Sequence, residues 1–150
     1  MLAEVDRVTF EKLFPSDPHP FISGAFCELN RSKVDSIIRL VDSALEIPVG
    51  LLAGIRGDTL LSPFSAPFGG FHFRRDNIYI SEIDKFLKQL ADYAKSKSLR
   101  RIEIITPPDL YHGSFNAKAI NSLIRHGYQT SCPDITNWVD LTGFKGAYTQ

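Results

Sequence analysis

The sequence predicts an α/β fold, α+β-like in character, in which helices flank a mixed and largely antiparallel central sheet. The first observation behind this prediction is a hairpin pattern: two apolar runs, residues 49–55 and 59–61, flank an Arg-Gly-Asp turn at 56–58. The second is an amphipathic helix that begins at Ser81 and leads to a strand at 101–106. Because a helix that joins two strands favours parallel pairing through a right-handed crossover, we expect one parallel pair in the sheet.

The first third of the chain contributes a strand and a short helix to this prediction. Residues 1–20 are expected to form a partly irregular arm, in which 8–10 are a candidate strand start and three prolines then extend the chain. Apolar residues at helical spacing predict a short helix over 21–29. A run rich in β-branched residues predicts a strand over 34–44.

The last third is expected to alternate between helix and strand. Ser81 is the predicted N-cap of the long helix, whose apolar stripe consists of Ile83, Phe86, Leu87, Leu90 and Ala94. A second helix is predicted over 116–126, with Gly127 just beyond its end. Residues 128–141 are predicted to return as one or two strands, in which Trp138 either packs in the core or stacks on a ligand.

Length, charge and cysteine usage limit the classes of protein. The 150 residues suit one domain, 1–150. Its 17 basic and 17 acidic side chains cancel, which argues against a duplex nucleic-acid partner and a polybasic membrane anchor. No apolar run approaches the roughly 20 residues that cross a bilayer, and the N-terminus lacks a signal-peptide pattern. With two separated cysteines read as reduced thiols, we expect a cytoplasmic protein.

The candidate binding site is the uncharged loop 62–71, which combines two prolines, two glycines and three phenylalanines. Such a segment either forms a buried corner or lines a cleft. In the second interpretation Phe64, Phe68 and Phe71 are walls of a groove beside Ser65. Gly69 and Gly70 would then let a substrate approach the backbone closely.

Two further residues are candidates for substrate binding. His72 follows the loop and is either a general base at a cleft or a histidine packed among aromatic side chains. Tyr111 belongs to a polar cluster with Asp109 and His112 after the strand that ends at two prolines. That cluster is either a ligand site at a strand end or a helix-entry loop with local capping bonds.

The sequence lacks the motifs of several enzyme and metal-site classes. There is no Gly-x-Ser-x-Gly elbow, no Walker motif, no His-Glu-x-x-His and no Cys-x-x-Cys pair. We therefore assign no catalytic residue and no metal ligand.

The order of elements, a β-meander followed by helix, strand, helix and strand, resembles the acyl-CoA N-acyltransferase (GNAT) superfamily. The loop 62–71, the strand 49–55 before it and the strand end at Thr106-Pro107-Pro108 resemble the first half of FemAB-like peptidoglycan-bridge aminoacyltransferases, which carry two GNAT-like units in tandem. The resemblance covers roughly residues 20–142. It implies a GNAT-like fold and, if the domain is active, an N-acyltransferase that transfers an acyl or aminoacyl group to an amine.

One departure from that family bears on the cofactor. GNAT enzymes that bind acyl-CoA open the long helix with a Gln/Arg-x-x-Gly-x-Gly/Ala segment, whose amides hold the pyrophosphate. Here no glycine lies between Phe71 and Ser81. Arg74 and Arg75 either contact phosphate or are solvated. No cofactor is therefore expected, although acyl-CoA stays open if another segment holds it.

Two functional hypotheses follow from these observations. In the first, the chain is a detached, non-catalytic or substrate-binding half that takes a small-molecule or peptide-like substrate and lacks its second GNAT-like unit. In the second, it is a protein-interaction or self-associating module on the same fold, in which a homodimer covers the apolar surface left by the missing unit.

Overall fold

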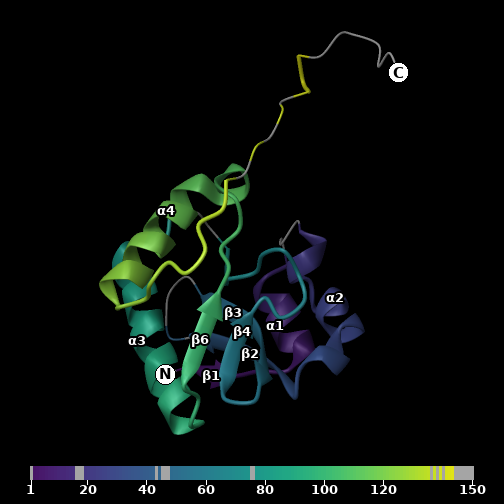
Figure 1. Cartoon of the computed structure of the whole chain (residues 1–150), viewed down its shortest axis with the longest axis vertical. Coiled ribbons are helices and arrows are strands. Elements are labelled where there is room, and N and C mark those ends of the chain that lie inside the picture. Colours follow the sequence, from purple (N-terminus) through teal and green to yellow (C-terminus); the bar gives the residue numbers. More distant parts are fainter. Residues whose placement is uncertain are drawn as a thin grey trace.

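The structure is a computed structural model that describes residues 2–15, 19–42, 44, 48–74, 77–135, 137, 139 and 141–143. In chain order its elements are β1 (Ala3–Glu4), α1 (Arg7–Leu13), the 3-10 helix η1 (Pro20–Ile22), α2 (Gly24–Leu29), the 3-10 helix η2 (Arg31–Lys33), β2 (Ser36–Asp42), β3 (Val49–Arg56), β4 (Thr59–Ser62), β5 (Phe71–Phe73), α3 (Ile80–Ser96), β6 (Arg101–Ile104) and α4 (Asp109–Arg125). Helices α3 and α4 lie on one side of the sheet and α1 and α2 on the other (Figure 1).

Among the described residues, six strands form one sheet in the order β1-β2-β3-β4-β6, and β5 pairs with β3 beside this path. All pairs are antiparallel except β4 and β6, which run parallel from Thr59 opposite Arg101 to Ser62 opposite Ile104. The predicted mixed, mostly antiparallel sheet flanked by helices is therefore confirmed. The expected parallel pair is present, and α3 lies in the connection that joins its two strands.

Strands β4 and β5 occupy the same edge of β3 in succession. Leu61 of β4 lies opposite Gly54, and Phe71 of β5 lies opposite Leu51. The residues between the two strands, 63–70, leave the sheet as a loop. The buried Ser62 hydroxyl closes the base of this loop, because it donates to the Leu52 carbonyl at 2.8 Å and accepts the Gly70 N–H at 3.0 Å.

Alternation along the strands creates one apolar core on each face. In β2, Ile38 and Leu40 belong to the core under α3 and α4, whereas Val41 belongs to the core under α1 and α2. The predicted stripe of α3 is buried throughout, and four of its five residues, Ile83, Phe86, Leu87 and Leu90, belong to the larger core. The smaller core consists of Phe10, Phe14, Cys27, Val41 and Leu52. The period of two in β2 thus positions both helical layers.

The beginning of the chain differs from the prediction. Residues 8–10 lie within the helix α1, because the Asp6 carboxylate caps it by accepting the Thr9 N–H at 2.8 Å. Phe10 and Phe14, four residues apart, then face the smaller core together. The helix predicted over 21–29 is divided into η1 and α2, since Ser23 caps a new helix by accepting the Phe26 N–H at 3.2 Å.

Both later helices begin earlier than predicted. α3 starts at Ile80 with Tyr79 as its N-cap, so Ser81 is not the cap. The Glu82 carboxylate accepts the Tyr79 N–H at 2.9 Å instead. α4 starts at Asp109 and contains a non-helical residue, His112, which joins a short first turn to the predicted helix. Its end agrees with the prediction, since Gly127 follows with φ +84°.

The strands predicted over 128–141 are absent from the part of that segment that the structure describes. Tyr128 is half-buried against the larger core, but Ile135, Val139 and Leu141 are 84%, 79% and 61% exposed. Alternation alone does not make a strand, because each strand needs a partner edge. Trp138 lies outside the described residues. In the described part of the chain, no helix has the length and apolarity to cross a membrane.

The packing of α1 against β3 predicts a size limit at Gly50. A Cβ at this position would lie 2.5 Å from Cε2 of Phe14, whereas a Cβ at Gly113, in α4, would meet nothing within 4 Å. We expect Gly50→Ala to lower the free energy of unfolding by about 1–3 kcal/mol in urea titrations. The control Gly113→Ala should raise it by up to about 1 kcal/mol, since alanine favours helix. Equal effects would contradict this packing.

Candidate functional site

Aromatic rings from three separate segments meet in a cluster that we call the aromatic corner: His19, Phe21, Phe26, Phe68 and Tyr111. The His19 ring centroid lies 4.5 Å from that of Phe68 and 5.0 Å from that of Tyr111. The Phe68 and Tyr111 centroids are 5.4 Å apart. Phe21 joins through Phe68 at 5.9 Å and contacts Phe26 at 5.4 Å. Phe68 is buried and Tyr111 is 40% exposed, so the cluster reaches the surface.

The aromatic corner lies beyond the carboxyl ends of the parallel strands. Phe68 belongs to the loop that follows β4, and Tyr111 belongs to the first turn of α4, which follows β6. The loop is tied to the end of β6, because Ile105 N–H donates to Ser62 O at 2.8 Å and Gly69 N–H donates to Ile105 O at 2.9 Å. Ligands of open α/β sheets bind outside this end of parallel strands.

Gly69 and Gly70, the two glycines predicted to admit a substrate, are required by the conformation of the loop itself. Gly70 has φ +99°, a conformation that side chains disfavour. A Cβ at Gly69 would lie 2.7 Å from the backbone nitrogen of Pro63. The close backbone approach at Gly69 is therefore made by the loop's own chain.

Phe64 lines a shallow apolar pocket next to the aromatic corner. The pocket is bounded by Phe21, Cys27, Leu52, Pro63, Phe64 and Gly69. Phe21 belongs to both the pocket and the corner, so the two share one wall. Phe71, the third predicted wall, does not join them, because it belongs to β5 and is buried in the larger core.

Ser65 is held by polar side chains that sequence analysis did not single out. Lys33 Nζ donates to Ser65 Oγ at 2.6 Å, and Ser65 Oγ donates to Asn30 Oδ1 at 2.8 Å. The Ser65 proton therefore points to an amide oxygen, and the exposed Lys33 ammonium acts as a donor. This geometry anchors the loop to η2 and does not form a nucleophile–base pair.

His72 is placed elsewhere, in the smaller core. Its side chain is buried, and its ring centroid lies 4.9 Å from Phe10 and 5.7 Å from Phe14. Of the two interpretations of this residue, the packed histidine matches its position. His112 packs against Phe73 with centroids 5.0 Å apart, so Tyr111 is the member of its cluster that enters the aromatic corner.

The amino-terminal end of α3 carries its own anion. The Glu82 carboxylate occupies the first turn and accepts the Tyr79 N–H. Arg74 is also engaged, because its guanidinium donates to the carbonyls of Leu13 at 2.5 Å and Lys12 at 3.1 Å. Arg75 lies outside the described residues. A phosphate at this helix end would meet the charge of Glu82, which disfavours binding.

Sequence reasoning missed His19 and Phe21 as members of the site. His19 stands between two prolines, and Phe21 falls within the helix predicted over 21–29, so neither position suggests a binding site. Both reach the corner because η1 begins at Pro20 and turns the chain back. No group of three or more His, Cys, Asp and Glu side chains in the described ranges is arranged to hold a metal ion.

Comparison with known proteins yields no relative. Neither the families of known proteins, nor curated protein sequences, nor solved structures include a match to this chain.

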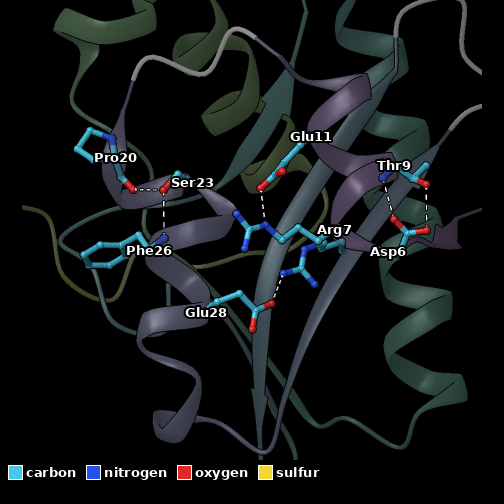
Figure 2. Close-up of polar contacts among 9 residues, drawn as sticks. Asp6, Arg7, Thr9, Glu11, Pro20, Ser23, Phe26 and Glu28 are labelled. Atoms are coloured by element: carbon cyan, nitrogen blue, oxygen red, sulfur yellow. Dashed lines mark hydrogen bonds and ion pairs between the residues drawn. The ribbon is translucent and has the colours of Figure 1, made fainter.

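Helix α2, which supplies Phe26 and Cys27 to the site, is anchored by charge. Arg39 Nη2 lies 2.7 Å from Glu28 Oε1, with the Arg39 side chain 9% and the Glu28 side chain 32% exposed. The hydrogen bond from Arg39 lowers the pKa of Glu28 below its ordinary value. Figure 2 shows this carboxylate beside the Arg7–Glu11 pair, which has the same 2.7 Å separation but is more exposed.

Neutralising the carboxylates of the two ion pairs is expected to change the free energy of unfolding by different amounts. We expect Glu28→Gln to lower the free energy of unfolding by about 1–2 kcal/mol at neutral pH, because it leaves Arg39 without its carboxylate. Glu11→Gln, the exposed control, should change it little. Since the folded pKa of Glu28 is depressed, its contribution is present above the unfolded pKa and is lost as pH falls through the folded value. Urea titrations at neutral and acidic pH would contradict this if the Glu28 difference persisted in acid.

The buried thiol in the site predicts low reactivity. Burial raises the pKa of Cys27 to about 11, so the thiol is neutral near pH 8, whereas Cys132 is exposed. We expect iodoacetamide to alkylate Cys27 in the Cys132→Ser variant at least about a hundredfold more slowly than Cys132 in the Cys27→Ser variant. Urea should remove the difference. Fast alkylation of native Cys27 would refute its burial.

Proposed function

We propose that this domain is a non-catalytic, substrate-binding relative of the N-acyltransferases, and that the aromatic corner binds a peptide-like amine. One observation carries the proposal: rings from three segments converge beyond the carboxyl ends of β4 and β6 and remain partly exposed at Tyr111. Ring faces attract an ammonium group, which is the acceptor chemistry that the FemAB-like resemblance implies.

Two features favour a binding role over acyl transfer. The first is the Glu82 carboxylate at the start of α3, in the place where an acyl-CoA pyrophosphate would need bare amides. The second is the state of the groups near the corner. Cys27 is held neutral by its raised pKa, and Ser65 directs its proton to Asn30. Neither group is activated for attack on an acyl donor.

The proposal is tested by NMR titration of the full chain with three probes: two peptides blocked at both ends, N-acetyl-Ala-Lys-Ala-amide and N-acetyl-Ala-Glu-Ala-amide, which differ in the side-chain ammonium, and acetyl-CoA. We expect the lysine peptide to shift amide signals of loop 63–70 and the first turn of α4, and the glutamate peptide and acetyl-CoA to leave them unchanged. Tyr111→Ala should weaken binding about two- to fivefold, as expected for loss of an exposed cation–π contact.

Tyr79→Ala is the matched control, because Tyr79 is also an exposed tyrosine but lies at the start of α3. It should bind the lysine peptide as the unaltered chain does. Absence of any peptide effect would refute the proposed ligand, and acetyl-CoA shifts at the start of α3 would refute the non-catalytic assignment.

A further inference from the structure

Strand β6 presents one edge that no other described strand pairs with. It is the last strand in the order β1-β2-β3-β4-β6, and it lies in front of the other strands in Figure 1. An edge strand offers a row of unpaired N–H and C=O groups to another chain. Proline and bulges, which natural proteins use to block such pairing, do not occur between Arg101 and Ile105.

The hydrogen bonds to β4 determine which backbone groups face the open side. Arg101 N–H donates to Asp58 O at 3.3 Å, and Ile105 N–H donates to Ser62 O at 2.8 Å. Alternate residues of a ladder direct their backbone groups the same way. The N–H and C=O of Ile102 and Ile104 therefore face away from β4, toward the open edge.

The side chains of β6 carry both charges on one face. Arg101 and Glu103 form an ion pair at 2.9 Å, and their side chains are 66% and 42% exposed. Ile102 and Ile104 point to the opposite face, where they pack against the larger core. The strand thus combines a charged outer face with an apolar inner face.

We propose that β6 pairs antiparallel with β6 of a second copy of this chain, with Ile102 on the twofold axis. In this register the two Ile102 residues exchange both of their outward-facing hydrogen bonds. Arg101 then lies opposite Glu103 of the second copy, and Glu103 lies opposite its Arg101. A twofold interface has to be self-complementary, and this one opposes unlike charges at two equivalent places.

Neighbouring registers do not satisfy both conditions. A pair centred on Arg101 would oppose two arginines, and a pair centred on Glu103 would oppose two glutamates. Each would also place on the axis a residue whose backbone groups face β4. Like charges directly opposite each other destabilise a sheet. A pair centred on Ile104 would keep the outward-facing hydrogen bonds but would place Glu103 opposite Ile105, so it would form no pair of unlike charges. Of these four registers, the one centred on Ile102 alone combines the hydrogen bonds with charge pairing.

Helix α4 provides apolar surface near this edge. It follows β6 and covers the face of the sheet to which Ile102 and Ile104 contribute, yet it leaves Ile120 and Ile124 39% and 59% exposed. In the paired molecule the sheet continues across the axis, and the two α4 helices lie on its same face. Contact between them would remove these side chains from water, which adds to the stability of strand pairing.

The register predicts a charge-swap experiment on the full chain. The unaltered chain should form a dimer whose fraction rises with concentration in sedimentation velocity. Arg101→Glu or Glu103→Arg should weaken the dimer roughly tenfold, because each places like charges opposite each other twice. The double variant Arg101→Glu with Glu103→Arg should restore it. Lys88→Glu, the same charge change at an exposed position of α3, should have no effect.

Amide hydrogen exchange gives a second readout that does not depend on charge. Ile102 N–H should exchange slowly in the dimer and rapidly after dilution, whereas Ile105 N–H, bonded to Ser62, should be protected at both concentrations. A monomer at all concentrations would overturn the proposal. So would a dimer that ignores the charge swap, or protection of Ile102 that does not depend on concentration, which would place another segment of the same chain on the edge.

Discussion

The Ser62 hydroxyl makes the contact on which the site depends. The Leu52 carbonyl of β3 lies where β4 has ended and β5 has not yet begun. The Ser62 hydroxyl donates a hydrogen bond to this carbonyl and accepts one from the Gly70 N–H at the other end of the loop. A buried carbonyl and a buried N–H would otherwise stay unsatisfied, at a cost of about 1–3 kcal/mol each. Because this one side chain satisfies both, residues 63–70 can leave the sheet and return to the same edge.

The loop formed in this way holds its aromatic side chains by neighbours from distant parts of the chain. Lys33 and Asn30 fix Ser65 on one side, and Ile105 fixes Gly69 on the other. Phe68 is then buried against His19 and Tyr111. An aromatic surface that is anchored at both ends in this way needs little reorganisation to receive a ligand.

Much of the fold could be predicted from hydrophobic periodicity, turn residues and the rule that a helix joins parallel strands. The hairpin of β3 and β4, the buried stripe of α3 and the parallel pairing of β6 follow from spacing and turn chemistry. The starts of helices could not, because they are decided by single capping contacts such as Asp6 with Thr9 and Glu82 with Tyr79. Residues 8–10 contain Val8 and Thr9, which favour strands, but the Asp6 cap and the burial of Phe10 outweigh that propensity.

Part of the candidate site could be predicted from local composition. The loop 62–71 is a candidate binding segment because it is rich in proline, glycine and phenylalanine. Tyr111 is a candidate because it follows a predicted strand. The partners of these residues come from 19–33, and no local pattern links those residues to the loop. The role of Gly69 likewise depends on how closely Pro63 approaches it, which is a property of the folded chain.

Arg74 joins the end of β5 to the last carbonyls of α1, across more than sixty positions of the chain. Those carbonyls carry the negative end of the helix dipole, so the guanidinium neutralises it in place of solvent. The contact holds the end of the first helix next to Phe14, whose ring packs against the ring of His72. An arginine from the middle of the chain thus acts as the C-terminal cap of a helix near its beginning, which couples the two segments although no strand pairing joins them.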